Sequence, residues 1–366
     1  MQKRPRQTDV AKLAGVSPAT VSVILNNRLD GNVRISAETR ARVLDAVEQL
    51  GYVTDPVARS LAGGRNSLLG VFAFDEIFPP QQRNLRYSFL VGIEHEAAKL
   101  GYDLLLFTSN NFTSNNFTSN NNADEQRRIY QGNMNRLRMA DGAILLGSAG
   151  SQEELNRLVA DQYPFVFIGR PELSDAPLSY VAADYTTATA QIVHEMLVQG
   201  HRRIIYVGML HNNTSYRERY AGYLMAYRQM GLAQLAVPAQ RLSATALTVD
   251  MIQRARAEGA TAFVLESEEE LLVPFFQALD KLKLHAPVDL SLGLLGDSMA
   301  DWNPPYPLTS FAIPREAMGR RAVHLLFELL QASPAQRASA PQVLQEILPC
   351  THLPGVTIGP PKESPL

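Results

Sequence analysis

Near the start of the chain, apolar residues recur every three or four positions, which is the spacing of one buried face of an α-helix. The first such run covers residues 8–14, with Thr8 as the expected N-cap and Gly15 as the expected end. A second run follows Ser17 and Pro18, a capping hydroxyl and a proline suited to the first helical position. The pattern predicts two short helices joined by a tight turn.

A third apolar run, residues 36–52, supplies the helix that two such short helices need in order to form a core, with Ser36 as its expected N-cap and Gly51 as its expected end. The three helices are expected to bury Val10, Ala11, Leu13, Ala14, Val21, Ile24, Leu25, Val43, Leu44, Val47 and Leu50. Three helices in about fifty residues, with a small-residue turn after the first, are typical of a helix-turn-helix DNA-binding domain. An ordinary three-helix cap on a larger protein would have the same spacing.

Residues 55–66 form a separate short pattern. Asp55 and Pro56 repeat the cap-plus-proline signal, and Gly63 and Gly64 end the run. The helix between them would be about 10 Å long, at 1.5 Å per residue. Because an isolated helix of that length is unstable in water, it must dock on another surface or fold only when it binds.

From Leu68 onward, short apolar strands alternate with amphipathic helices in two successive series. This alternation predicts an α/β fold with two doubly wound parallel-sheet subdomains. Within the first series, residues 123–140 are expected to form a helix, and the tandem repeat at 109–122 a surface loop without an assigned role.

The same patterns suggest domain boundaries. The expected parts are a DNA-binding domain at 1–54, a hinge helix and linker at 55–66, and a ligand-sensing and dimerisation body at 67–366, with a first subdomain at about 67–172 plus 304–331 and a second at about 173–303 plus 340–360.

Charge is distributed unevenly along the chain. Residues 1–65 carry ten Lys and Arg against six Asp and Glu, whereas the remainder carries 24 against 30. A basic head on an acidic body suits a DNA-binding module attached to a sensor. No apolar run reaches the length of a membrane span, and the N-terminus lacks the apolar core of a signal peptide, so we expect a cytoplasmic protein.

Signatures of catalysis and metal binding are absent from the sequence. It contains no glycine-rich phosphate loop, no nucleophile elbow and no paired-histidine zinc motif. The one cysteine, Cys350, cannot form an intrachain disulfide, and no Cys/His cluster offers a metal site. We therefore expect neither an enzyme nor a bound cofactor.

Two parallel α/β subdomains bind small molecules at the carboxyl ends of their strands. Effector contacts are therefore expected from residues that follow predicted strands: Asp75, Tyr87, Phe89, Arg170, Arg219, Glu268 and Asp297. Charged groups that hydrogen-bond adjacent hydroxyls, with aromatic rings against apolar faces, suit a sugar. Arg219 could instead be a solvated helix side chain, and Asp297 a loop cap.

The segments TDVAKLAGVSPATVSVILN, LGY and VARSLAGGR, in this order and spacing, resemble the lactose- and purine-repressor (LacI/GalR-type) family of bacterial transcriptional regulators. The resemblance implies a homodimer that binds a near-palindromic DNA operator, and a hinge helix that wedges a leucine, here Leu61, into the minor groove. The expected DNA contacts are Thr8, Ser17, Pro18, Ala19, Thr20, Ser22, Val23, Asn26, Arg59 and Leu61.

For the effector, the resemblance implies an arginine in an S-x-R-x-R-x-x-G segment, here Arg219, and an aspartate after the penultimate strand, here Asp297. The sequence departs from the family at LLGDS, where a Gly-aromatic-Asp-Asp run is frequent, and at Gly169 and Ser267–Glu268. The expected function is a repressor that responds to a sugar or sugar derivative. The alternatives are a purine-type corepressor-dependent regulator and a solute-binding protein with a vestigial DNA-binding head.

Overall fold

A computed structural model of the chain describes residues 5–25, 35–52, 66–74, 77–78, 86–109, 127–147, 151–171, 178–210, 213–243, 246–297, 304–332 and 342–362. The chain divides into two compact units, residues 1–68 and 69–366, and each is described separately. The proposed hinge at 55–66 lies outside the described residues except for Asn66, and the tandem repeat at 109–122 lies outside them except for Ser109.

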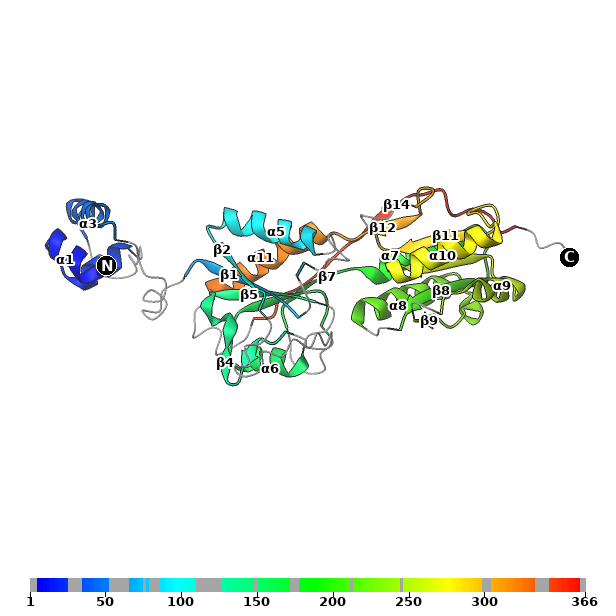
Figure 1. The fold of residues 1–366 in the computed structure, drawn as a ribbon, viewed down its shortest axis with the longest axis horizontal. Coiled ribbons are helices and arrows are strands. Elements are labelled where there is room, and N and C mark those ends of the chain that lie inside the picture. Colours follow the sequence, from blue (N-terminus) through cyan, green and yellow to red (C-terminus); the bar gives the residue numbers. More distant parts are fainter. Residues whose placement is uncertain are drawn as a thin grey trace. The chain divides into compact units, whose positions relative to one another are not determined.

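The first unit contains α1 (Gln7–Ala14), α2 (Pro18–Leu25) and α3 (Ala37–Leu50) (Figure 1). The predicted caps are confirmed for the second and third helices, because Ser17 Oγ accepts from Thr20 N at 3.1 Å and Ser36 Oγ from Thr39 N at 3.2 Å. Gly15 and Gly51 end α1 and α3 in the left-handed conformation, at φ 67° and 59°.

The cap of α1 differs from the prediction. Thr8 lies inside the helix, and the Asp9 carboxylate accepts from the backbone N–H of Arg6 at 2.7 Å. The predicted burial is also wrong for two leucines, because Leu13 is 51% exposed and Leu44 is 48% exposed. Ala11 and Ala14 are buried as predicted, and Ala46, which was not predicted, is buried as well. Small side chains fill part of this core because the three short helices pack closely.

The described part of the second unit has two large sheets, of six and four strands, and two small sheets of two strands each. We call the six-stranded sheet, with α5 (Tyr87–Lys99), α6 (Gln152–Ala160) and α11 (Arg315–Gln331), the first lobe. Its strands lie in the order β13 (Gln345–Leu348), β7 (Tyr180–Ala183), β6 (Phe165–Ile168), β5 (Gly142–Leu146), β1 (Leu68–Ala73) and β2 (Asp103–Phe107).

Alternate residues of these strands pack on opposite faces, because successive side chains of a strand point in opposite directions. Val71 and Ile144 pack with α5 and α11, whereas Phe72 and Leu145 pack with α6 (Figure 1). The two covering helices α5 and α11 cross closely at Gly92, where a Cβ would lie 2.0 Å from the carbonyl oxygen of Glu316.

The second lobe is the four-stranded sheet with the helices that cover it, α7 (Tyr185–Val198), α8 (Thr214–Gln229), α9 (Val249–Ala257) and α10 (Glu269–Leu282). Its strands lie in the order β11 (Ser291–Leu295), β10 (Ala262–Glu266), β8 (Ile204–Met209) and β9 (Gln240–Leu242), and each neighbouring pair is parallel. The short helix η2 (Ala233–Leu235) precedes β9. The predicted α/β fold with two parallel sheets is confirmed.

The chain passes between the lobes after β7, between β11 and α11, and after β13. Near these crossings β12 (Ser310–Ala312) pairs with β14 (Thr351–Leu353). The predicted subdomain boundaries are wrong for two strands, since 180–183 and 345–348 belong to the sheet of the first lobe. A strand of four residues is too short to show a periodicity, so β7 was missed.

The helix predicted at 123–140 is also wrong in its described part. That segment forms β3 (Tyr130–Gln131), β4 (Met134–Asn135) and the short helix η1 (Arg136–Met139). Gly132 makes the turn between the two strands at φ 58°. The buried carboxylate of Glu154 on α6 accepts from the backbone N–H groups of Ile129 and Tyr130, at 3.1 and 3.2 Å, which holds the segment against the first lobe.

A buried histidine joins the C-terminal segment to the second lobe. His201 Nδ1 lies 2.7 Å from Thr261 Oγ1, and its Nε2 lies 2.8 Å from both Ser291 Oγ and the carbonyl oxygen of Gly359. Since a carbonyl can only accept, Nε2 carries the proton and Nδ1 accepts from the threonine hydroxyl. Burial lowers the pKa of His201.

This lowered pKa predicts a loss of stability in acid. The unfolded chain takes up a proton at His201 as the pH falls through about 6.5, whereas the folded chain does so only at lower pH. The free energy of unfolding should therefore decrease as the pH falls. Urea unfolding at about pH 7.5 and about pH 5.5, for the parent and for His201→Asn, isolates this contribution from the other histidines. The variant should be less stable at the higher pH and less sensitive to pH; an equal loss at both pH values would contradict the prediction.

Candidate functional site

The exposed surface of α2 is the candidate DNA-reading face. Pro18 and Ala19 are exposed, and Ser22 and Val23 are half-buried. The amide of Gln7 donates to the carbonyl oxygen of Pro18 at 3.2 Å and so ties α1 to the start of α2. Neither Pro18, Ala19 nor Val23 can make a bidentate hydrogen bond to a base edge, so this face offers mainly apolar contacts.

The other predicted DNA contacts are unevenly placed. Ser17 is exposed and its hydroxyl lies 2.8 Å from that of Thr20, so both hydroxyls are already engaged within the turn. Thr8 is exposed on the first turn of α1. The remaining expected contacts, Asn26, Arg59 and Leu61, lie outside the described residues and stay predictions.

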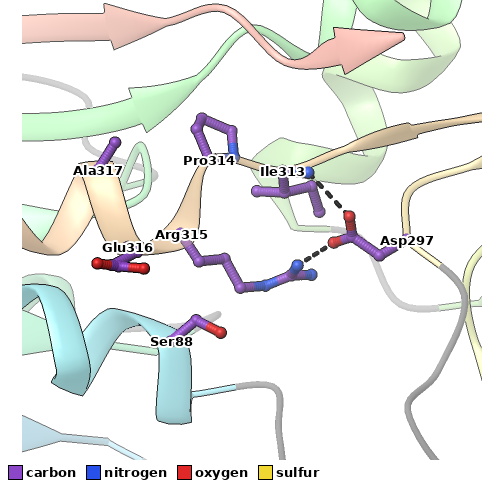
Figure 2. A pocket seen from close by; sticks show the side chains of 7 residues that line it. All are labelled: Ser88, Asp297, Ile313, Pro314, Arg315, Glu316 and Ala317. Atoms are coloured by element: carbon purple, nitrogen blue, oxygen red, sulfur yellow. Dashed lines mark hydrogen bonds and ion pairs between the residues drawn. The ribbon is translucent and has the colours of Figure 1, made fainter. Parts of the chain in front are cut away.

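A pocket of about 350 Å³ lies in the second unit where the segment after β11 meets the N-terminal ends of α5 and α11. Figure 2 shows the residues that line it: Ser88, Asp297, Ile313, Pro314, Arg315, Glu316 and Ala317. Asp297 was predicted here from the sequence, whereas Ser88 and Arg315 were not.

Each oxygen atom of the Asp297 carboxylate has a partner. Its Oδ1 accepts from the backbone N–H of Ile313 at 3.0 Å, and its Oδ2 forms an ion pair with Arg315 (Figure 2). The two side chains are 27% and 16% exposed, so both remain in contact with the pocket. A cation in the first turn of a helix is unfavourable for the helix dipole unless it has a partner. The position of Arg315, directly after Pro314 at the start of a helix, is therefore a sequence signal that this arginine has an acidic partner.

Arg219 lies on α8, and its expected contact with an effector stays a prediction. Its side chain is buried, its Nε donates to the carbonyl oxygen of Leu295 at 2.8 Å, and its guanidinium lies 4.1 Å from the centre of the Tyr185 ring. The guanidinium also lies 5.9 Å from the centre of the Tyr216 ring. The arginine is therefore not a solvated helix side chain, and it supports the end of β11 two residues before Asp297.

A second buried charge lies at the carboxyl ends of β8 and β10. Glu266 accepts from Tyr206 Oη at 2.5 Å, from Arg241 Nη1 at 3.2 Å and from the backbone N–H of Met209 at 3.0 Å. Burial raises the pKa of this carboxyl. Glu266 was not predicted from the sequence, although a glutamate at the end of the apolar run AFVLE was a visible signal.

The remaining expected effector residues lie outside the lining of the pocket. Tyr87 is exposed beside Ser88, and Phe89 packs against the hydrophobic core, which is where an apolar residue on the inner face of α5 belongs. Arg170 forms an ion pair with Glu218 at 2.9 Å, and Glu268 accepts from Tyr216 Oη at 2.8 Å. Asp75 lies outside the described residues.

Two further features concern metal ions and membranes. Over the described ranges, no group of three or more His, Cys, Asp or Glu residues is arranged to hold a metal ion. In the same part of the chain, no single helix is long and apolar enough to cross a membrane; α1 and α2 together pass on length and composition, with a bend of 104° between them.

The surroundings of Arg219 lead to a stability prediction with a control two residues away. Arg219→Ala removes a buried hydrogen bond and a cation–π contact and leaves a cavity, which should lower the free energy of unfolding of the second unit by about 2–4 kcal/mol. Arg217→Ala, on the exposed side of α8, should change it by less than about 0.5 kcal/mol. Urea unfolding followed by circular dichroism measures both; equal effects would show that Arg219 has no supporting role.

Comparison with known proteins assigns this architecture to a family. The model for bacterial regulatory proteins of the lacI family matches residues 8–55, that for periplasmic binding proteins and the sugar binding domain of the LacI family matches 86–248, and a periplasmic binding protein-like domain matches 193–349. Catabolite control protein A of Priestia megaterium is 29% identical over 226 residues. The match covers 61% of this chain and 61% of the length of that relative.

Two solved structures share the fold over 97% of the chain. One is the complex of the transcriptional regulator CelR with cellobiose, at 20% identity and a TM-score of 0.59 over 100% of that chain. The other is the lac repressor dimer bound to operator and the anti-inducer ONPF, at 21% identity and a TM-score of 0.65 over 99% of that chain. The structures support the fold, and the matched domains show that this chain carries a DNA-binding head of the lacI family of bacterial regulatory proteins, followed by a body of the periplasmic-binding and LacI sugar-binding type.

Proposed function

We propose that the chain is a transcriptional repressor whose affinity for a DNA operator changes when a small effector binds in the pocket beside Asp297. The observation that carries this proposal is the presence, on one chain, of a helix-turn-helix head with an exposed α2 and of a two-lobed body with a polar pocket near its crossings. The relatives and solved structures named above are regulators, and one of them holds both operator and a small molecule.

On the DNA side, one reading helix covers too few bases for specificity in a genome, so two copies should read two half-sites of a near-palindrome as a homodimer. The lac repressor structure is such a dimer. The proposed division of labour is DNA binding by residues 1–54, a hinge at 55–66 with Leu61 as the minor-groove wedge, and dimerisation and effector binding by residues 67–366. A bacterial regulator of this kind works in the cytoplasm.

On the effector side, the charges of the pocket favour a neutral polyhydroxylated ligand. The Arg315 guanidinium is already paired with Asp297, and Glu316 adds a second carboxylate to the lining. A phosphate group would meet two carboxylates, whereas sugar hydroxyls can donate to Asp297 and accept from Arg315 and Ser88. Among the described residues, the lining of the pocket includes no aromatic ring on which a purine would stack, which favours a sugar over the purine-type corepressor. The solved CelR complex contains cellobiose, a sugar of the favoured class.

The DNA-binding half is tested by selecting duplexes from a random library with the full chain. We expect an enriched near-palindrome, whereas no enrichment would favour the solute-binding alternative. Val23→Ala should weaken binding to the selected duplex about tenfold. The substitution removes two methyl groups from an apolar contact with DNA, and this contact is worth about 1–2 kcal/mol. Val47→Ala on α3, which packs half-buried in the core of the head, is the control for lost stability. Equal affinities of Val23→Ala and the parent would remove Val23 from the base-reading set.

The effector half is tested by filling the pocket. Ser88→Leu projects extra carbon atoms into a space of about 350 Å³ and should weaken the effect of an active neutral sugar on operator binding by about tenfold or more. Glu94→Leu, on the same helix with its side chain 67% exposed, should leave it unchanged. The measurement is a titration of the protein–operator complex with neutral mono- and disaccharides, including cellobiose, and their phosphates. A response that survives in Ser88→Leu places the effector elsewhere.

A further inference from the structure

Two ion pairs join residues of the first lobe to residues of the second. Arg170 follows β6 in the first lobe, and its Nη1 lies 2.9 Å from Oε1 of Glu218 on α8 of the second lobe. Arg315 begins α11, which packs on the first lobe, and pairs with Asp297 just after β11 of the second lobe. The partners in each pair are far apart in sequence or separated by a crossing, so each pair depends on how the lobes meet.

The Arg170–Glu218 pair is partly withdrawn from solvent. The Glu218 side chain is 13% exposed and that of Arg170 37% exposed. The guanidinium also lies 5.6 Å from the centre of the Tyr180 ring on β7, which holds the arginine against its own lobe. A partly buried pair is screened less by salt than an exposed one, so its attraction acts directly on the approach of the two lobes.

The two pairs differ in their relation to the pocket. Asp297 and Arg315 line it, and a ligand hydroxyl can compete for either group. Neither Arg170 nor Glu218 is among the lining residues, so a ligand in the pocket leaves their pair intact. One cross-lobe contact is therefore open to a ligand and the other is not.

We propose that the Arg170–Glu218 ion pair is a latch that holds the two lobes together without a ligand, and that it sets the ligand concentration at which the Asp297–Arg315 pocket responds. A ligand can shift an equilibrium between lobe arrangements only by its difference in affinity for them. A latch that favours one arrangement of the lobes changes the population of that arrangement before any ligand binds. It therefore changes the ligand concentration needed for a response, although it makes no contact with the ligand. The second part of this proposal rests on the function proposed above.

The first test measures the lobes alone, with neither DNA nor ligand. Spin labels at Glu153→Cys on α6 and Lys281→Cys on α10, both exposed positions, report the distance between the lobes in the full chain. Because Cys350 is a free, half-buried cysteine that could take up a third label, Cys350→Ser is included in every labelled variant. Glu218→Gln should add a population of different separation, and Arg170→Glu, which places two carboxylates together, should add more.

The double exchange Arg170→Glu with Glu218→Arg restores opposite charges and should return the distance distribution to that of the parent. The matched control is Glu258→Gln, which breaks an ion pair with Arg203 that lies within the second lobe, and it should leave the distribution unchanged. An unchanged distribution in Glu218→Gln would overturn the latch. A double exchange that stays as altered as the single variants would overturn it too, because the side chains would then matter for packing rather than for their charge.

The second test uses an operator duplex and cellobiose or whichever neutral sugar the titration above identifies. Glu218→Gln should shift the midpoint of the sugar response several-fold relative to both the parent and Glu258→Gln. An unchanged midpoint with altered lobe distances would overturn the regulatory part of the proposal. A chain that bound no DNA in any variant would overturn the proposed function, and the distance measurement would still decide whether the latch exists.

Discussion

The body of this protein depends on one constraint, which is that its chain crosses between two sheets three times within a small region. The crossings follow β7, β11 and β13, and each leaves the carboxyl end of a parallel strand. Carboxyl ends of parallel strands are where such folds bind ligands. The same constraint that joins the lobes therefore places polar groups beside the pocket, and any relative motion of the lobes must be absorbed there.

The buried charged groups of the second lobe each have several partners that stabilise the charge. Arg219 is enclosed by Tyr185, Tyr216 and a backbone carbonyl, and the Glu266 carboxylate accepts three hydrogen bonds. A buried charge without partners would be very unfavourable, so these groups specify one arrangement of their surroundings. The groups with remaining exposure, Asp297 and Arg315, are the ones that line the pocket. Structural support and the lining of the pocket are thus divided between neighbouring residues.

Local signals in the sequence predicted much of the fold. Ser17, Ser36, Gly15 and Gly51 have the predicted capping roles because caps depend on a few adjacent residues. The exposed leucines in the head and the missed strand β7 show the limit, since burial and strand pairing are decided by segments distant in sequence.

The candidate site shows the same limit. Asp297 was found because it follows a strand, but its partner Arg315 and the pair of Arg170 with Glu218 arise only from the way the lobes meet. Arg219 was expected to contact a ligand because the lacI family has an arginine at that place; the structure shows it buried near Tyr185 and Tyr216, and the ligand contact stays a prediction. A motif identifies a position, whereas the role of the side chain also depends on what the neighbouring elements supply.

The central claim is that the effector pocket and the DNA-reading head are coupled, and coupling between two binding sites is reciprocal. Isothermal titration of the full chain with the active sugar, alone and saturated with operator duplex, measures this coupling directly. The account predicts that operator changes the dissociation constant of the sugar by the same factor by which the sugar changes that of the operator. Equal sugar affinities with and without operator, for a protein that binds both, would contradict it.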